Sequence, residues 1–210
     1  SAKYLNSPDT PIFSKSMVLF GLDKAKESIR KNNFSILVEG QMDLILSHQS
    51  GYKNTIATSG TALSDAIASR ENVVSNLGLV RRLSDNIVLA FDGDKAGFNA
   101  SLRAGKIALS LGMDVKVANM PQGTDPADLI SRGHSQTLGR SPTGEPGEAK
   151  NGVDAWREAV RDSKHLIEFL LDKVLLDAKG DNRKAGREIK EKVLPFVSSI
   201  ESSIEQMHFI

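Results

Sequence analysis

Two acidic residues, Asp92 and Asp94, follow directly after an unbroken apolar run from Ile87 to Phe91. Such a run with β-branched members is typical of a strand that is covered on both faces, as in a parallel sheet. Ligands of open α/β sheets bind at the carboxyl ends of the strands, and two carboxylates there suit a hard divalent cation. The Asp-Gly pair at 92–93 is also a common turn signal, so this segment taken alone would more often be a turn than a metal site.

Other acidic residues stand at the ends of further predicted strands. Glu39 follows the apolar run 34–38, Asp43 comes one helical turn later, and Asp125 follows the segment 114–120. Glu39 and Asp43 are spaced so that both can face one crevice. Asp43 also has a purely structural explanation, because an acid in the first turn of a helix offsets the helix dipole.

The number of acids at one edge favours a bound cation. Two carboxylates about 4 Å apart repel by about 4 kcal/mol at an effective dielectric of about 20. A fold gains nothing by gathering several carboxylates unless a cation or a proton neutralises them. The sequence therefore predicts a site for Mg²⁺, with Mn²⁺ as a possible substitute, that involves Glu39, Asp92, Asp94 and Asp125.

The elements that must place these acids alternate between strands and helices. Apolar periodicity predicts strands at 34–38, 55–58, 86–91 and 114–120, and helices at 19–32, from 42, at 62–83 and at 96–111. This order predicts an α/β fold with a mostly parallel sheet that is flanked by helices on both faces. Because carboxyl ends of parallel strands share one edge, the acids are expected to lie together there.

Composition changes after this region. Residues 133–152 are rich in Pro, Gly and Ser and predict a flexible loop, and helical patterns at 153–161, 165–178 and 182–206 predict a small all-helical subdomain over 153–210. Pro195 is expected to break or kink the last helix. The predicted organisation is thus a lead-in segment with a helix over 1–33, an α/β domain over 34–132, the loop and the helical subdomain.

Composition also limits the function. The 210 residues hold 27 basic and 26 acidic residues, which neither favours nor excludes a nucleic-acid partner, because a local basic surface can hide in a balanced total. The absence of cysteine excludes a thiolate zinc site within this sequence. No segment reads as a membrane span or signal peptide, so we expect no membrane partner, and the first residues, Ser-Ala-Lys, suggest a fragment of a longer protein.

Four polar or flexible positions could contact phosphates. Gly60 allows a tight turn into a helix whose free amides could hold a phosphate, although Gly-Thr is a common turn. Lys3, Asn6 and Lys15 lie in a proline-containing segment, and local chemistry alone makes them ordinary loop residues.

These motifs together resemble the Toprim domain of primases, topoisomerases and some nucleases. The resemblance is carried by Glu39-Gly-Gln-Met-Asp43, Gly60-Thr61, Phe91-Asp-Gly-Asp-Lys-Ala-Gly97 and Asp125-Pro-Ala-Asp128. The segment Lys3–Lys15 is similar to one found in bacterial DNA primases of the DnaG type, and the helical tail fits their RNA polymerase domain. Gln41, where the family usually has an aromatic residue, and Ala127, where an acid is common, depart from the pattern.

The resemblance implies a DNA-directed RNA polymerase that makes short primers during DNA replication in the cytoplasm. Glu39 matches the general base or metal-organising acid, Asp92, Asp94 and Asp125 match metal ligands, and Asp43 matches a further acid of the same group. Lys3, Asn6 and Lys15 match a patch that binds nucleotide or template, to which we add Gly60 and Lys95. The implied partners are a single-stranded DNA template, ribonucleoside triphosphates and a replicative helicase that contacts a region absent here.

Three alternatives stay open from the sequence. A Toprim nuclease would share the acids, and a topoisomerase fragment would need a nucleophilic tyrosine, for which only Tyr4 and Tyr52 are present. A non-catalytic module could bind nucleotide or DNA without turnover.

Overall fold

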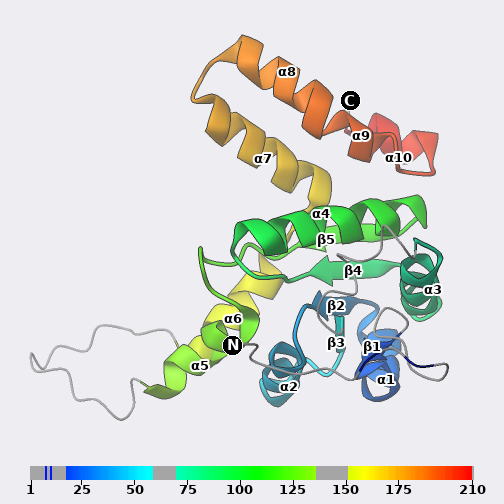
Figure 1. Ribbon diagram of the computed structural model, residues 1–210, viewed down its shortest axis with the longest axis vertical. Coiled ribbons are helices and arrows are strands. Elements are labelled where there is room, and N and C mark those ends of the chain that lie inside the picture. Colours follow the sequence, from blue (N-terminus) through cyan, green and yellow to red (C-terminus); the bar gives the residue numbers. More distant parts are fainter. Residues whose placement is uncertain (1–7, 9, 11–17, 59–69, 136–150, 210) are drawn as a thin grey trace, which may run out of the picture.

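A computed structural model describes residues 8, 10, 18–58, 70–135 and 151–209 (Figure 1). Its centre is a six-stranded sheet in the order β1-β3-β2-β4-β5-β6. The strands are β1 (Leu19–Phe20), β2 (Ser35–Val38), β3 (Thr55–Thr58), β4 (Asn86–Leu89), β5 (Asp114–Val117) and β6 (Lys164–His165). The four central strands are parallel, and the two edge strands are antiparallel to their neighbours. The predicted α/β class with a mostly parallel sheet is confirmed.

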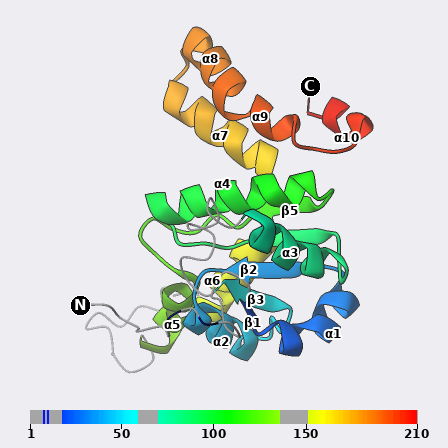
Figure 2. The same ribbon diagram turned by 45° about the vertical axis from the view of Figure 1, so that its right-hand side comes forward.

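Helices cover both faces of this sheet. They are α1 (Leu22–Asn32), α2 (Gln41–Gln49), α3 (Arg70–Arg81), α4 (Lys95–Ser110), α5 (Pro126–Ser135), α6 (Gly152–Arg161), α7 (Leu166–Ala178), α8 (Asn182–Lys192), α9 (Leu194–Val197) and α10 (Ser203–Met207). Helices α7 to α10 form a separate layer above α4 in two views of the molecule (Figures 1 and 2). Within the described ranges, no helix is long and apolar enough to cross a bilayer.

The core lies on both sides of the sheet because consecutive strand residues point to opposite faces. In β2, Leu37 belongs to the cluster under α1, α3, α4 and α7, whereas Ile36 and Val38 belong to the cluster under α2, α5 and α6. All four residues of β2 are buried. The uninterrupted apolar runs in the sequence therefore reflect strands with two covered faces.

Several predicted boundaries were wrong. The chain at 19–20 is a short strand paired with β3, and Gly21, at φ 78°, separates it from α1. The predicted helix 182–206 is three helices. The predicted break at Pro195 is confirmed, because Pro195 lies in the first turn of α9, where its missing amide costs nothing. Helix α5 continues to Ser135, beyond the predicted start of the loop at 133. The rest of that loop, at 136–150, and residues 62–69 of the predicted helix 62–83 lie outside the described residues.

Candidate active site

The parallel pairing of β2, β4 and β5 places the carboxyl ends of these strands at one edge of the sheet. Glu39 follows β2 directly, and its carbonyl accepts a hydrogen bond from the Thr58 hydroxyl at 3.3 Å. Asp92 follows β4 after Ala90 and Phe91, which are both buried. The two acids thus leave neighbouring strands at the same edge, as the sequence predicts.

The pKa of Asp92 shows that the acids lie close enough to interact. Its pKa is raised to about 7, first by burial and then by the charges of four other acids, Glu39, Asp43, Asp125 and Asp94. All five acids that the sequence singles out therefore interact within one site. A carboxyl group with such a pKa is protonated about half the time at neutral pH unless a positive charge enters the site.

The pKa of Glu39 is also affected by burial and by the charges of its neighbours. Burial raises its pKa, the charges of Asp94 and Asp43 raise it further, and the guanidinium of Arg103 on α4 opposes them. The Nε atom of Arg103 is buried and has no hydrogen-bond partner in the described part of the chain. The sequence patterns above did not single out Arg103, although its position two turns into the helix after Asp94 was an available signal.

Asp94 begins α4 as its N-cap residue. Its Oδ1 atom accepts a hydrogen bond from the Gly97 amide at 2.8 Å, which fixes the carboxylate against the first turn of the helix. A side chain at Gly97 would bring its Cβ to 2.3 Å from the Asp92 carbonyl oxygen. The glycine in this motif is therefore required because the helix starts in contact with the backbone of Asp92.

Gly93, between Asp92 and Asp94, joins the segment before α4 to the loop that follows β5. Its amide donates to the Thr124 carbonyl at 2.9 Å, and its carbonyl accepts from the Gly123 amide at 3.0 Å. A Cβ at Gly93 would lie 2.1 Å from the Pro121 carbonyl oxygen. The Asp92-Gly93-Asp94 segment is consequently held against the loop that leads to Asp125.

Asp43 and Asp125 both bind backbone amides. Asp43, which is buried, accepts from the Gly40 amide at 2.9 Å and from the Ala127 amide at 3.0 Å, so it joins the first turns of α2 and α5. Asp125 accepts from the Asp128 amide at 2.6 Å at the start of α5. The structure thus gives Asp43 a clear structural role, and its role as a metal ligand stays a prediction.

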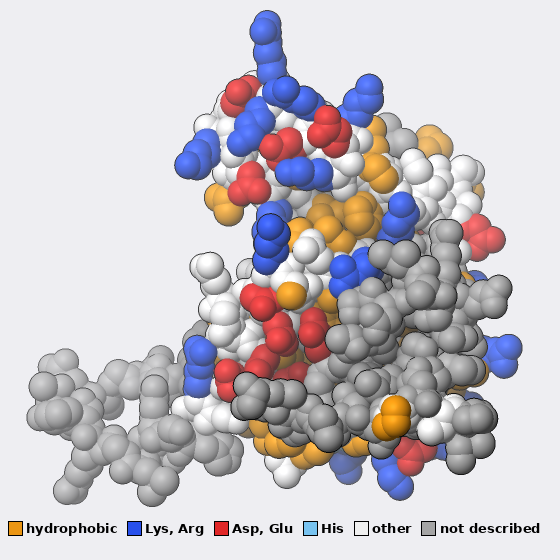
Figure 3. All heavy atoms as spheres, viewed as in Figure 1, with side chains coloured by type: hydrophobic (Ala, Val, Ile, Leu, Met, Phe, Trp, Pro, Cys, Tyr) orange, Lys and Arg blue, Asp and Glu red, His pale blue; other side chains and the backbone are white. Residues whose placement is uncertain are grey.

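A cavity of about 840 Å³ opens beside these acids. Asp92, Gly93, Asp94 and Lys95 line one side of it, the loop 117–123 lines another, and Phe169 and Lys173 reach it from α7. The space-filling view shows acidic side chains gathered in the middle of this face, below a helical layer with many basic side chains (Figure 3). Of the residues predicted to bind nucleotide or DNA, Lys95 lines this cavity, whereas Lys3, Asn6, Lys15 and Gly60 lie outside the described residues.

The donor set suits a hard cation, although it does not form a complete cage. Among the described residues, no three acidic or histidine side chains are arranged to hold a metal ion by themselves. Mg²⁺ in nucleotide-processing sites is commonly bound by one or two carboxylates, and substrate phosphates and water supply the remaining ligands. Burial and then the charges of four other acids raise the pKa of Asp92, and a cation would offset both effects, so these residues fit such an ion.

Comparisons with known proteins show what the chain as a whole is similar to. A family model for the Toprim domain matches residues 33–119, and a model for the N-terminal domain of the DNA primase catalytic core matches residues 1–26. The DNA primase of Staphylococcus aureus is 36% identical over 208 residues, which are 99% of this chain and 30% of that protein. The chain therefore spans less than a third of the length of this curated relative.

Solved structures are similar over the same length. A DNA primase domain from Pseudomonas aeruginosa has a TM-score of 0.72 at 28% identity, covering 100% of this chain and 58% of that one. The RNA polymerase domain of Mycobacterium tuberculosis primase DnaG, in complex with double-stranded DNA, has a TM-score of 0.69 at 29% identity. That match covers 99% of this chain and 59% of the other.

Proposed function

The chain belongs to the DNA primase family and contains a Toprim domain, and from this premise we propose that it is a catalytic core for RNA primer synthesis. The reaction is template-directed nucleotidyl transfer on single-stranded DNA. A terminal 3′ hydroxyl attacks the α-phosphate of a ribonucleoside triphosphate, and pyrophosphate leaves. The family matches favour this function over a nuclease or a topoisomerase.

One observation carries the proposal above the others, namely the convergence of four other acids on Asp92. Burial and these charges raise the pKa of Asp92 to about 7. A site that only had to fold would not gather uncompensated carboxylates, whereas a site for a divalent ion and a triphosphate needs them.

We assign the ion to Asp92 and Asp94, with Glu39 and Asp125 beside it, and propose Mg²⁺ with Mn²⁺ as a substitute. When bound, the ion would neutralise charge on the reacting phosphates and lower the pKa of the attacking hydroxyl. Asp94 is held for this task by its hydrogen bond to the Gly97 amide. Asp43 fixes α5, and hence Asp125, relative to α2 through the Ala127 amide.

Glu39 is the group that we propose to accept the proton of the attacking hydroxyl. Its pKa is raised by burial, Asp94 and Asp43, which makes its carboxylate a better proton acceptor than an exposed one. Lys95, which lines the cavity with Asp92 and Asp94, supplies a positive charge to the incoming phosphates. The rigid Asp92–Gly97 turn contributes by positioning these groups before the substrate arrives.

The partners follow from the same proposal. The Mycobacterium relative is described in complex with DNA, which supports DNA as a ligand of this chain. The template is proposed to be single-stranded, and Lys3, Asn6, Lys15 and Gly60 remain the residues expected to contact it or the nucleotide. A replicative helicase would contact a region outside these residues, and the reaction would take place in the cytoplasm.

The test replaces an acid of the site by its neutral amide, which removes the negative charge and keeps the size of the side chain. Asp94→Asn keeps an oxygen that can cap α4, so we expect an unchanged unfolding midpoint and a loss of primer synthesis of at least about 100-fold, as for loss of a charged group acting in the transition state. Asp92→Asn should lose activity similarly. Primer synthesis is measured on single-stranded template with Mg²⁺ and labelled ribonucleotides.

Asp85→Asn is the matched control, because Asp85 is an exposed acid next to the amino end of β4 that pairs with Arg81 at 3.6 Å. This variant should retain the parent's activity. Full activity of Asp94→Asn or Asp92→Asn would contradict the proposed function.

A further inference from the structure

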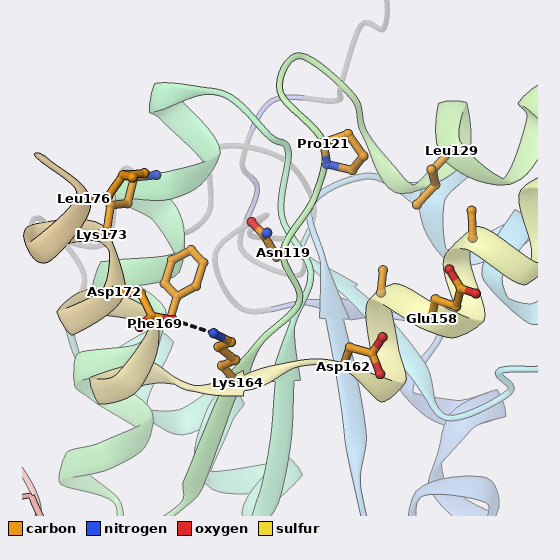
Figure 4. Close-up of a pocket in the computed structure, with 12 residues that line it drawn as sticks. Asn119, Pro121, Leu129, Glu158, Asp162, Lys164, Phe169, Asp172, Lys173 and Leu176 are labelled. Carbon is orange, nitrogen blue, oxygen red and sulfur yellow. Dashed lines mark hydrogen bonds and ion pairs between the residues drawn. The ribbon is translucent and has the colours of Figure 1, made fainter.

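Lys173 of α7 lines the cavity that Asp92 and Asp94 also line. Its Nζ atom lies 4.1 Å from the centroid of the Phe98 ring on α4 and 5.8 Å from that of Phe169 on α7. The two rings are themselves in contact, with centroids 6.2 Å apart. Figure 4 shows Lys173 and Phe169 extending from α7 toward the loop that carries Asn119 and Pro121. An ammonium over an aromatic face is attracted by the ring quadrupole, so these rings fix the position of the charge.

The charge of Lys173 is not neutralised by an acid in the described part of the chain. The adjacent carboxylate, Asp172, is engaged with Lys164 from β6, as the dashed line in Figure 4 marks. An exposed lysine on a helix more often pairs with a nearby acid or extends into solvent. The Lys173 side chain instead lies near the rings of Phe98 and Phe169 and lines the cavity, where its ammonium group can bind an anion.

Two of the acids to which we assign the ion line the same cavity. Asp92 and Asp94 line it with Lys95, and Phe98, Phe169 and Lys173 line it as well. A substrate phosphate that enters beside the acids thus faces two positive charges, one from the start of α4 and one from α7. A lysine ammonium binds phosphate as a point charge that tolerates several geometries.

We propose that Lys173, positioned by Phe98 and Phe169, binds a phosphate group of the substrate, either in the triphosphate or in the nucleic-acid strand. This inference rests on the proposed function and gives the helical layer a direct part in substrate binding. Lys173 is thereby a binding residue that the family resemblance did not supply.

The experiment measures binding in the absence of turnover, so that it does not depend on catalysis. One arm titrates the purified protein with a fluorescent single-stranded oligonucleotide at several salt concentrations, and the other with a non-hydrolysable ribonucleoside triphosphate and Mg²⁺. Lys173→Gln removes the charge, Lys173→Arg keeps it, and Phe98→Leu removes the ring while keeping an apolar side chain. Lys190→Gln is the matched control, because Lys190 is exposed on α8, which contributes no residue to the cavity.

We expect Lys173→Gln to weaken binding about three- to tenfold in one arm, Lys173→Arg to restore most of it, and Lys190→Gln to bind like the parent. If the phosphate belongs to the strand, the slope of log affinity against log salt falls by about 0.7 in the oligonucleotide arm. If it belongs to the triphosphate, the loss appears in the nucleotide arm alone. Phe98→Leu should show a smaller loss in the same arm.

Unchanged affinity of Lys173→Gln in both arms, or a loss equal to that of Lys190→Gln, would overturn the inference. A protein that binds both ligands normally and yet makes no primers would instead contradict the proposed function. The two failures are therefore distinguishable.

Discussion

At the residue scale, the site is defined by a carboxyl group that is costly to ionise. Asp92 is half-buried among four other acids, and its pKa of about 7 lies well above the ordinary value of 3.8. The folded protein therefore holds a proton on this residue over a pH range in which the unfolded chain has released it. Stability is lost as the pH rises through this range.

Asp92→Asn tests this linkage. Without divalent ions, we expect the variant to be more stable than the parent at pH 8 by about 1 kcal/mol, which allows for solvent screening of a half-buried group. The difference should shrink as the pH falls from 7 toward 4 and vanish below the unfolded pKa. Urea unfolding at pH 4, 6 and 8 in EDTA measures it, and an equal difference at every pH would contradict the electrostatic explanation.

At the element scale, the site depends on two turns that touch each other. The Asp92–Gly97 turn begins α4, and the loop 121–124 leads into α5. Their contact is made by backbone atoms at Gly93, where no side chain fits. Each turn is recognisable in the sequence, but their contact joins residues about 30 positions apart and is not visible there.

Gly93→Ala should therefore destabilise the protein by about 1–3 kcal/mol, because the Pro121 carbonyl must move to admit a methyl group. Primer synthesis should fall at the same time, since Asp92 and Asp94 move with the turn. Gly186→Ala in α8 is the control, because its Cβ meets nothing within 4 Å and alanine favours a helix interior by about 0.5–1 kcal/mol. Urea unfolding of both variants should give changes of opposite sign, and stability of Gly93→Ala equal to the parent's would argue against the contact.

At the scale of the whole molecule, charge is segregated although the total is nearly zero. The net charge of +1 combines acids gathered beside the cavity with basic side chains exposed on the helical layer (Figure 3). The arrangement brings Lys173 of α7 into the cavity that Asp92 lines. The division of the chain into a Toprim domain and a helical subdomain at the predicted boundaries stays a prediction.

Leu166 joins the helical layer to the rest of the molecule. It is fully buried at the start of α7, and a Cβ at Gly105 of α4 would lie 2.4 Å from it. Leu166→Ala should lower the free energy of unfolding by about 3–4 kcal/mol, as for other buried leucines. Leu176→Ala is the control, because Leu176 is 77% exposed and its loss should change stability by less than about 0.5 kcal/mol. Equal effects of the two variants in urea unfolding would show that α7 is not anchored at Leu166.

The sequence by itself determined the four parallel strands, the helices between them and the edge at which the acids gather. It did so because buried strands are uninterrupted apolar runs and because parallel strands end at one edge. The tertiary structure alone decided that Asp43 binds the Ala127 amide, that Arg103 faces Glu39 and that Lys173 lies over Phe98. Each of these contacts joins segments far apart in the chain, and their partners are chosen by the packing of helices on the sheet, which no local pattern of residues encodes.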